Sequence, residues 1–297
     1  MSNIEVVCVG VVTMDTIALV DVYPDEDERV IAKEISRSGG GPAAVAAVAL
    51  NRLGVRSAIV GTIGDDADGA QVMKIFAREG VDTSGICVGS TATSGSVIVA
   101  SRAYNSRAIS TRQPVKQEVL NSAAQELMRQ AQWIHVDHVG IEHITGAGFS
   151  RGKGPLISFD AGYNVEKFDV SKFDLFVPTD RQMELRHPTT NLEIALERDA
   201  VAGKNIVVAT QGAKGSMGFS AQSGLVNSSG FSLEVVSTLG AGDVFHGALV
   251  AQIIQGYGLQ DALKRANAAA ALSCRGLDGQ SMIPTTSELN AYLEANK

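Results

Sequence analysis

Short, continuous runs of apolar residues alternate with helix-like segments along most of the chain. A strand covered by helices on both faces is apolar throughout, whereas a strand with one wet face alternates apolar and polar residues. The alternation therefore predicts an α/β fold with a central, mostly parallel sheet flanked by helices. The expected strands are 6–12, 58–63, 133–136, 156–159, 175–178 and 205–209, with short ones around 216 and 225, and the expected helices are 42–53, 67–79, 117–129, 191–202, 241–255 and 261–274.

Two pairs of segments do not fit this sheet, because they alternate loosely around polar turns. Each pair is typical of a β-hairpin with one wet face. No repeat or low-complexity linker divides the chain, so we expect a single domain over 1–297 with a small β outgrowth formed by roughly 13–38 and 95–112. The paired segments are 16–22 with 29–35, and 96–101 with 107–111.

The composition excludes several classes of protein. With 45% hydrophobic and 19% charged residues, the chain is too apolar to be disordered. Its 25 Lys and Arg against 32 Asp and Glu give a net charge of −7 without a basic run, so no nucleic-acid partner is expected. The longest apolar stretch, 39–50, is too short to cross a bilayer, so no membrane partner is expected. The widely spaced Cys8, Cys87 and Cys274 indicate reduced thiols in a cytoplasmic protein.

The most specific motif is Gly240-Ala241-Gly242-Asp243, which follows a predicted strand at 233–236 and opens a predicted helix. Unpaired backbone N–H groups at a helix start, left bare by glycine, suit a phosphate or a developing negative charge. Asp243 in the first turn has two interpretations. It either interacts with the helix dipole or takes a proton from an attacking hydroxyl, and a carboxylate placed where anions bind favours the second.

Three other glycine-rich motifs are weaker. Residues 39–44 match a G-x-G-x-x-A dinucleotide pattern but follow a hairpin, so a tight turn is at least as good an interpretation. Residues 148–152 match the G-x-S-x-G elbow of hydrolases, but a strand follows where a helix is needed, so Ser150 is not expected to be a nucleophile. Residues 210–215 form either an ordinary turn or a nucleotide-phosphate loop.

A cluster of histidines surrounds the strand predicted at 133–136. His135 and His138 on one strand would point to opposite faces, so they are not expected to hold a zinc ion together with His143. Crevices form at the carboxyl ends of parallel strands. His138 is therefore a candidate to line a substrate pocket.

These motifs together resemble the phosphofructokinase-B family of carbohydrate kinases, also called ribokinase-like. The resemblance spans essentially the whole chain: an early strand with Gly10 and Asp15, the double-glycine helix start, a T-x-G-x-x-G turn at 210–215, the G-A-G-D motif, and an alanine-rich segment after Asn267. The region around Asp15 and the glycines at 39–44 looks most like the sulfofructose kinase branch.

The resemblance implies ATP-dependent phosphorylation of a sugar hydroxyl with Mg²⁺, a reaction that depends on positioning and electrostatic stabilisation. Asp243 would be the base, and the amides of Gly240, Ala241 and Gly242 would hold the charge of the transferring phosphoryl group. The β outgrowth would be a lid that excludes water. The other implied contacts are Asp15, Gly40 and Gly41 with the sugar, and Thr210, Gly212, Gly215 and Asn267 with the nucleotide.

The chain departs from the family pattern at several positions. Ser237 stands where many members have an aspartate that helps to hold a monovalent cation, which leaves a K⁺ requirement open. Ala44 stands where an asparagine ligand of the sugar is common. The N-x-x-E motif, which organises magnesium and phosphate, is displaced into residues 178–184. The metal candidates there are Asp180 and Glu184, with Gln182 as the alternative.

The substrate is the least determined feature. The branch resemblance favours a ketohexose or an anionic derivative such as sulfofructose or a phosphofructose. Arg29 and Arg112, together with Arg107, lie on predicted lid strands from which they would reach an anionic group. A nucleoside kinase and a non-catalytic sugar-binding protein of the same fold are the alternatives. Because family members pair through their lids and unpaired strand edges associate, a homodimer through the lid is also expected.

Overall fold

The computed structural model describes residues 4–104, 106–112, 120–162 and 169–296. A nine-stranded main sheet is parallel through its centre, and β12 and β13 add an antiparallel edge. The α/β prediction is therefore confirmed. The order across the sheet is β13 (Gly224–Ser229), β12 (Gly215–Ser220), β11 (Ile206–Thr210), β10 (Leu175–Phe176), β9 (Leu156–Phe159), β8 (Trp133–Val136), β1 (Val6–Val9), β4 (Ser57–Gly64) and β5 (Asp82–Gly89).

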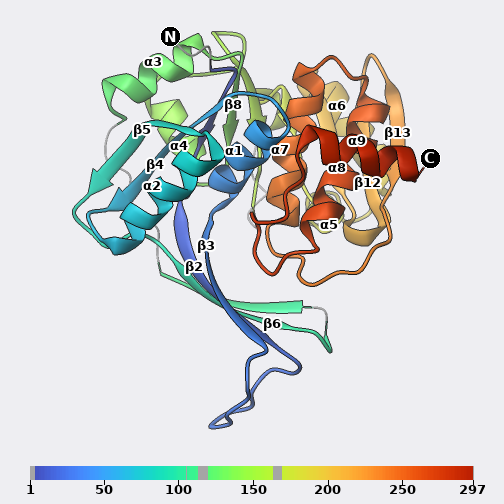
Figure 1. Ribbon diagram of the computed structural model, residues 1–297. Coiled ribbons are helices and arrows are strands. Elements are labelled where there is room, and N and C mark those ends of the chain that lie inside the picture. Colours follow the sequence, from blue (N-terminus) through green and yellow to red (C-terminus); the bar gives the residue numbers. More distant parts are fainter. Residues whose placement is uncertain (1–3, 105, 113–119, 163–168, 297) are drawn as a thin grey trace.

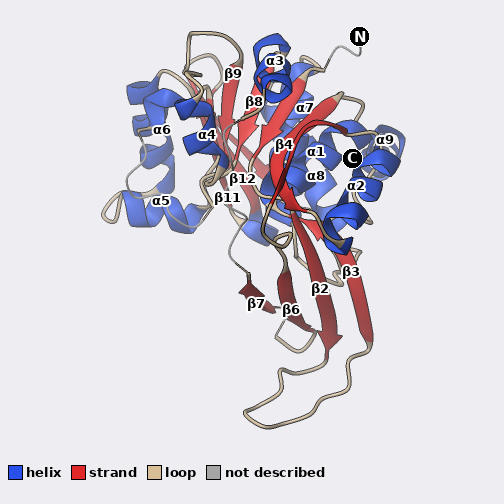
Figure 2. Ribbon diagram, turned by 90° about the vertical axis from the view of Figure 1, so that its left-hand side faces the viewer, coloured by secondary structure: helices blue, strands red, loops and turns tan. Residues whose placement is uncertain are grey.

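Helices cover both faces of the main sheet (Figure 2). Along β1, Val6 and Cys8 enter one hydrophobic core, and Val7 and Val9 enter the other. Both faces of the strand are buried, which explains its continuous apolar run. The first core contains α1 (Pro42–Arg52), α2 (Ala67–Glu79), α7 (Ala241–Ile254), α8 (Leu259–Ser273) and α9 (Thr286–Ala295), and the second contains α3 (Ser122–Gln130), α4 (Gly140–Gly146), α5 (Asp180–Arg186) and α6 (Leu192–Gly203).

Small residues let α1 and α7 pack closely at the centre of the first core. Residues 43–50 of α1 are all buried, and Pro42 occupies the first turn, where its missing N–H costs nothing. A Cβ added to Gly247 of α7 would lie 2.6 Å from the carbonyl oxygen of Ala46. This close contact fixes α7, which carries Asp243 in its first turn, against the sheet.

A four-stranded second sheet projects from the body of the molecule (Figure 1). It consists of β3 (Glu34–Gly40), β2 (Thr13–Val20), β6 (Ser96–Ser101) and β7 (Ser106–Thr111), in that order, and we call it the lid sheet. β2 pairs in parallel with β6, so the two predicted hairpins merge into one sheet. The strand predicted at 29–35 is wrong, because β3 begins at Glu34; Arg29 lies in the connection before it.

Other differences from the predicted elements have local causes. The strand predicted at 233–236 is irregular: Val235 and Val236 are exposed, and the Val236 N–H donates to the carbonyl of Cys274 rather than to a strand. The helix predicted at 117–129 begins at Ser122, with Asn121 as its N-cap; residues 117–119 lie outside the described part of the chain. The sequence reading also missed β5, α4, α5 and α9.

The described segments include no helix that combines the length and the apolar character needed to cross a membrane.

Candidate active site

The start of α7 lies at the centre of the candidate site. Gly240 precedes the helix with a φ of 72°, and a Cβ on it would lie 2.7 Å from the Cα of Gly279. A side chain there would therefore be both strained and blocked. Apart from its chain neighbours and the backbone of its own helix, no described atom lies within 4 Å of where a Cβ on Gly242 would stand. The Ala241 N–H, one of the amides predicted to hold phosphoryl charge, donates to the carbonyl of Thr238 at 3.4 Å, so that part of the prediction is wrong. The N–H groups of Gly242 and Asp243 remain the candidates for an anion at this helix start.

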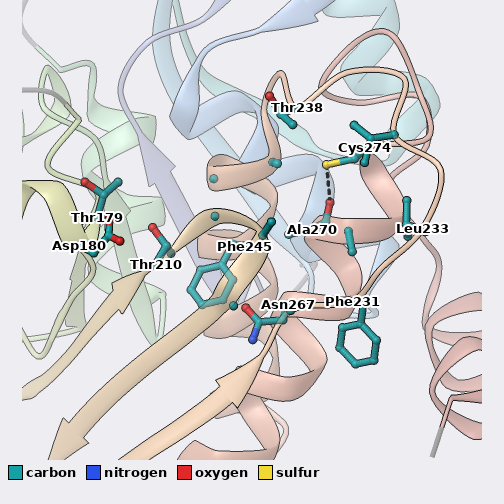
Figure 3. Close-up of a pocket in the computed structure, with 18 of the residues that line it drawn as sticks. Thr179, Asp180, Thr210, Phe231, Leu233, Thr238, Phe245, Asn267, Ala270 and Cys274 are labelled. Carbon is teal, nitrogen blue, oxygen red and sulfur yellow. Dashed lines mark hydrogen bonds between the residues drawn. The ribbon is translucent and has the colours of Figure 1, made fainter. Parts of the chain in front are cut away.

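A cavity of about 420 Å³ lies beside this helix start (Figure 3). Figure 3 shows Thr179, Asp180 and Thr210 on one side of it and Phe231, Leu233 and Cys274 on the other. Its walls are therefore polar at one end and apolar at the other. The lining includes the predicted nucleotide contacts, Thr210, Gly212, Gly215 and Asn267, and two residues of the helix start, Ala241 and Gly242.

The loop after β11 supplies the polar end of this cavity. Gly212 has a φ of 56°, and no described atom lies within 4 Å of its missing Cβ, so bare backbone faces the cavity. Gly215 has a structural reason to be glycine, because a Cβ would lie 2.1 Å from the Ser228 carbonyl oxygen. Asn267 lines the cavity, but its amide nitrogen donates to the same carbonyl at 3.0 Å. Asn267 therefore holds β13 in place at the cavity wall.

The predicted sugar contacts gather where the lid sheet joins the body. Asp15 on β2 is buried and accepts the Ser96 N–H at 2.8 Å. A Cβ on Gly40 would lie 2.1 Å from an Asp15 carboxylate oxygen, and one on Gly41 would lie 2.3 Å from the carbonyl oxygen of Val11. Gly40 thus lets the backbone approach Asp15 closely, and Gly41 lets it approach the chain at Val11. Burial raises the pKa of Asp15, against the lowering effect of its hydrogen bonds.

Of the three arginines proposed for the lid, the cavity lining contains Arg107. It faces the body from β7 and donates from Nη1 to the hydroxyl of Thr238 at 3.1 Å, two residues before the helix start. Arg112 instead donates to the carbonyl of Thr93 at 3.1 Å, and Arg29 is an exposed residue of the connection before β3. Arg107 therefore links the lid sheet to the anion-binding end of α7.

Two carboxylates that the sequence reading missed follow adjacent strands. Asp137, directly after β8, is fully buried and accepts the N–H groups of Val11, Val139 and Gly140 at 2.7 to 2.9 Å. Asp160, directly after β9, accepts the Gly162 N–H at 2.9 Å. The signal was present, since an aspartate follows each of two predicted strands, and parallel neighbours end at the same edge of a sheet.

His135 and His138 do not share one strand, contrary to the prediction. β8 ends at Val136, so His135 lies on the strand and His138 lies beyond it; the assumption that one strand carries both is wrong. His138 is exposed, and a Cβ on Gly162 would lie 2.8 Å from its Nδ1. His138 does not line the cavity described above, whereas His135 is buried in the core.

The carboxyl of Asp243 has a raised pKa at this edge of the sheet. Burial raises the pKa of its carboxyl well above the usual value, and the negative charge of Asp160 raises it further. The guanidinium of Arg107 opposes this shift, and the carboxylates of Asp137 and Asp15 reinforce it. A carboxylate that holds a proton readily, beside unpaired helix N–H groups, is suited to accept a proton from a hydroxyl.

Comparison with known proteins agrees with this geometry. A model of the pfkB family of carbohydrate kinases matches residues 3–150 and 169–286. The chain belongs to this family. It is 25% identical over 301 residues to the ribokinase of Haemophilus influenzae, covering 96% of this chain and 97% of the relative. It is 26% identical over 303 residues to a fructokinase of Vibrio alginolyticus, covering 93% of this chain and 96% of the relative.

The fold comparison gives the same result for this pfkB-family member. The structure of Arabidopsis thaliana ribokinase, solved with ribose and ATP, superposes with a TM-score of 0.80 at 21% identity and covers 99% of each chain. The predicted ribokinase-like fold and the assignment to the carbohydrate kinases are both confirmed. The resemblance to the sulfofructose kinase branch is not confirmed by these relatives.

The start of α5 shows how this pfkB-family member departs from N-x-x-E. Thr179 and Gln182 occupy that spacing and form a capping box, in which each side chain accepts the other residue's backbone N–H, at 3.2 and 2.6 Å. Asp180 begins the helix and lines the cavity, whereas Glu184 is exposed and lies outside the lining. In the part of the chain that the structure describes, no three His, Cys, Asp or Glu side chains form a metal cluster.

The replacement of the family aspartate by Ser237 also has a structural consequence. The Ser237 hydroxyl accepts the Leu239 N–H at 3.1 Å, and the Ser237 N–H donates to the carbonyl of Cys274 at 3.2 Å. The side chain thus stabilises the turn that leads into the helix start.

Proposed function

We propose that the protein is an ATP-dependent sugar kinase in which Asp243 is the base. The observation that carries this proposal is the position of Asp243: it lies in the first turn of α7, directly after Ala241 and Gly242, which line a cavity of about 420 Å³ together with the bare backbone at Gly212. The adenine ring would lie among the apolar residues at that cavity's wall, including Phe231 and Leu233, and the triphosphate would run toward the N–H groups of Gly242 and Asp243.

The reaction follows from this arrangement. A sugar hydroxyl, held near Asp15, attacks the γ-phosphorus in line; the new O–P bond forms as the bond to the β-phosphate oxygen breaks, and ADP leaves. The hydroxyl proton passes to the carboxylate of Asp243. The unpaired N–H groups at the start of α7 stabilise the negative charge on the transferring phosphoryl group, and the lid sheet excludes water.

Mg²⁺ fits the donor set at the polar end of the cavity. Asp180 offers a carboxylate beside Thr210 and the bare loop at Gly212. Magnesium is commonly held by one or two carboxylates together with substrate phosphates, and when bound it neutralises phosphate charge. Glu184 is exposed and outside the lining, so within this proposal Asp180 is the protein's contribution to the metal.

For the substrate, we infer a ketohexose or an anionic derivative of one. Arg107 supplies a cation at the junction of the lid sheet and the helix start, where it would contact the transferring phosphoryl group or an anionic substituent of the sugar. A fructokinase among the relatives supports a ketohexose.

The test measures ADP release with a panel of ketohexoses, their sulfo and phospho derivatives, pentoses and nucleosides, with and without K⁺. We expect turnover with a ketohexose class, and a loss of about 10²- to 10⁴-fold in kcat for Asp243→Asn. Calorimetry with ATP checks that the variant still binds nucleotide. Wild-type turnover in Asp243→Asn would refute the base; turnover restricted to nucleosides, or tight sugar binding without turnover, would refute the sugar kinase.

We also propose that two copies pair through the lid sheet. Ile35 and Val97 lie on the lid face that points away from Asp15 and are 69% and 61% exposed. Burying such side chains removes apolar surface from water. Light scattering at micromolar concentration should give a dimer for the wild type and a monomer for Val97→Asp, and a monomeric wild type would contradict the proposal.

A further inference from the structure

A row of polar side chains runs through the first hydrophobic core, beneath the start of α7. His135 on β8 and Ser158 on β9 are cross-strand neighbours, and the His135 Nδ1 lies 3.2 Å from the Ser158 hydroxyl. The ring of His246 on α7 packs edge-on against His135, with ring centroids 5.8 Å apart and an interplanar angle of 75°. All three side chains are buried. Polar groups at such a depth are costly unless they have partners.

His246 faces a carboxylate at one end of this row. Asp160 follows Ser158 by two residues and so points to the same face of the sheet. One Asp160 oxygen lies 3.6 Å from the His246 Nδ1, and the other accepts the Gly162 N–H at 2.9 Å. Within the described residues, the Nδ1 of His246 has no hydrogen-bond partner and is inaccessible to solvent. A proton on this nitrogen would face the carboxylate of Asp160.

Asp243 and His246 occupy the same side of α7, because residues three apart in a helix lie one turn apart. His246, which lies against Asp160, is thus one turn below Asp243, and Asp243 directly follows the cavity-lining Ala241 and Gly242. α7 also packs tightly on α1 through Gly247, so its position leaves little freedom for the first turn. A contact between His246 and Asp160 consequently acts on the residue that carries the reacting proton.

We propose that His246 and Asp160 are a positioning pair for the base: the imidazole of His246, with its Nδ1 3.6 Å from an Asp160 oxygen, faces that carboxylate from α7 and by this electrostatic contact sets the place and charge environment of Asp243. The inference rests on the proposed role of Asp243. Neither residue touches the substrate in this proposal; both act through Asp243.

The charges around the pair determine in which direction each substitution should move the pKa of Asp243. The charges of Asp160, Asp137 and Asp15 raise the pKa of Asp243 and the guanidinium of Arg107 lowers it, whereas His246 lies against Asp160 and His135. Burial lowers the pKa of His246 and Asp160 raises it. A neutral His246 with its proton on Nδ1 would attract the Asp160 carboxylate and so hold its negative charge away from Asp243. Losing Asp160 should therefore ease ionisation of Asp243, and losing the donor should hinder it.

The experiment compares the pH profile of kcat/KM for wild type, Asp160→Asn, His246→Asn and His246→Leu. We expect the acidic limb to move down by about half a unit or more in Asp160→Asn and up in His246→Leu. His246→Asn keeps a donor and should leave the limb near its wild-type position. If thermal stability falls in the variants while every limb stays in place, the pair serves packing alone and the proposal is wrong.

A second readout does not depend on activity. Nitrogen NMR of the five histidines should show a proton on the Nδ1 of His246 in the wild type, assigned by its absence in His246→Asn, and loss of that state in Asp160→Asn. An unprotonated Nδ1 in the wild type would overturn the proposal. Failure of the base itself is distinguishable, since Asp243→Asn would then retain wild-type kcat whatever the state of His246.

Discussion

Replacing Arg107 by alanine tests how far the lid sheet takes part in the reaction. The guanidinium donates to the hydroxyl of Thr238 at 3.1 Å and lines the cavity beside the start of α7. In the proposed reaction the guanidinium also contacts the transferring phosphoryl group or an anionic substituent of the sugar, and a hydrogen bond to a charged group contributes about 1.5–3 kcal/mol. Since each 1.36 kcal/mol of barrier is tenfold in rate, we expect kcat/KM to fall by about 10- to 150-fold. Arg107 lies on an exposed edge strand, so the free energy of unfolding should change by at most about 0.5 kcal/mol.

The same substitution has a predicted pH signature. The positive charge of Arg107 lowers the pKa of Asp243, so its removal should raise that pKa. A base works in its deprotonated form, and the acidic limb of kcat/KM should therefore move to higher pH in Arg107→Ala. Arg107→Lys keeps the charge and should keep the limb while losing part of the rate, because an ammonium lacks the planar fork of a guanidinium.

Steady-state kinetics from pH 5 to 9, with ATP and the sugar varied separately, decide the question. Arg102→Ala is the matched control, because Arg102 is an exposed arginine of the same hairpin, in the turn after β6, and lies outside the cavity lining. The argument is refuted if Arg107→Ala loses less than about threefold in kcat/KM and its limb coincides with that of wild type.

Two further substitutions test the edge of the sheet. Asp137→Asn places an amide N–H₂ against three backbone N–H donors, so at least one buried N–H loses its acceptor, which costs about 1–3 kcal/mol. Thermal unfolding should therefore show a lower Tm for this variant, and an unchanged Tm would contradict the role of Asp137 as a buried acceptor. Gln182→Glu introduces a carboxylate while keeping the capping box. When Mg²⁺ is titrated at fixed ATP, the Mg²⁺ concentration that gives half-maximal activity should be lower than in the wild type by about threefold or more. An equal or higher concentration would show that this position does not bind the metal.

The predictions from sequence were most accurate where local physics decides the outcome. The start of α7 followed from glycines and an aspartate at a helix start, and the bounds of β8, β9 and α2 were predicted to the residue. α2 illustrates the reason: Asp66 caps one end, and Gly80 takes the left-handed conformation at the other. The error at 233–236 arose because apolar residues resemble a strand even where no neighbouring strand pairs with them.

The amino-acid sequence by itself determined the α/β class, the family and the helix start that bears Asp243, because each depends on residues that are close together in the chain. The tertiary structure alone decided which lid arginine reaches the cavity, that Asp137 and Asp160 end adjacent strands under α7, and that Gln182 caps a helix with Thr179. Arg107 and Thr238 are 131 residues apart. Contacts of that kind depend on the order of strands in the sheet, and no local pattern of residues encodes that order.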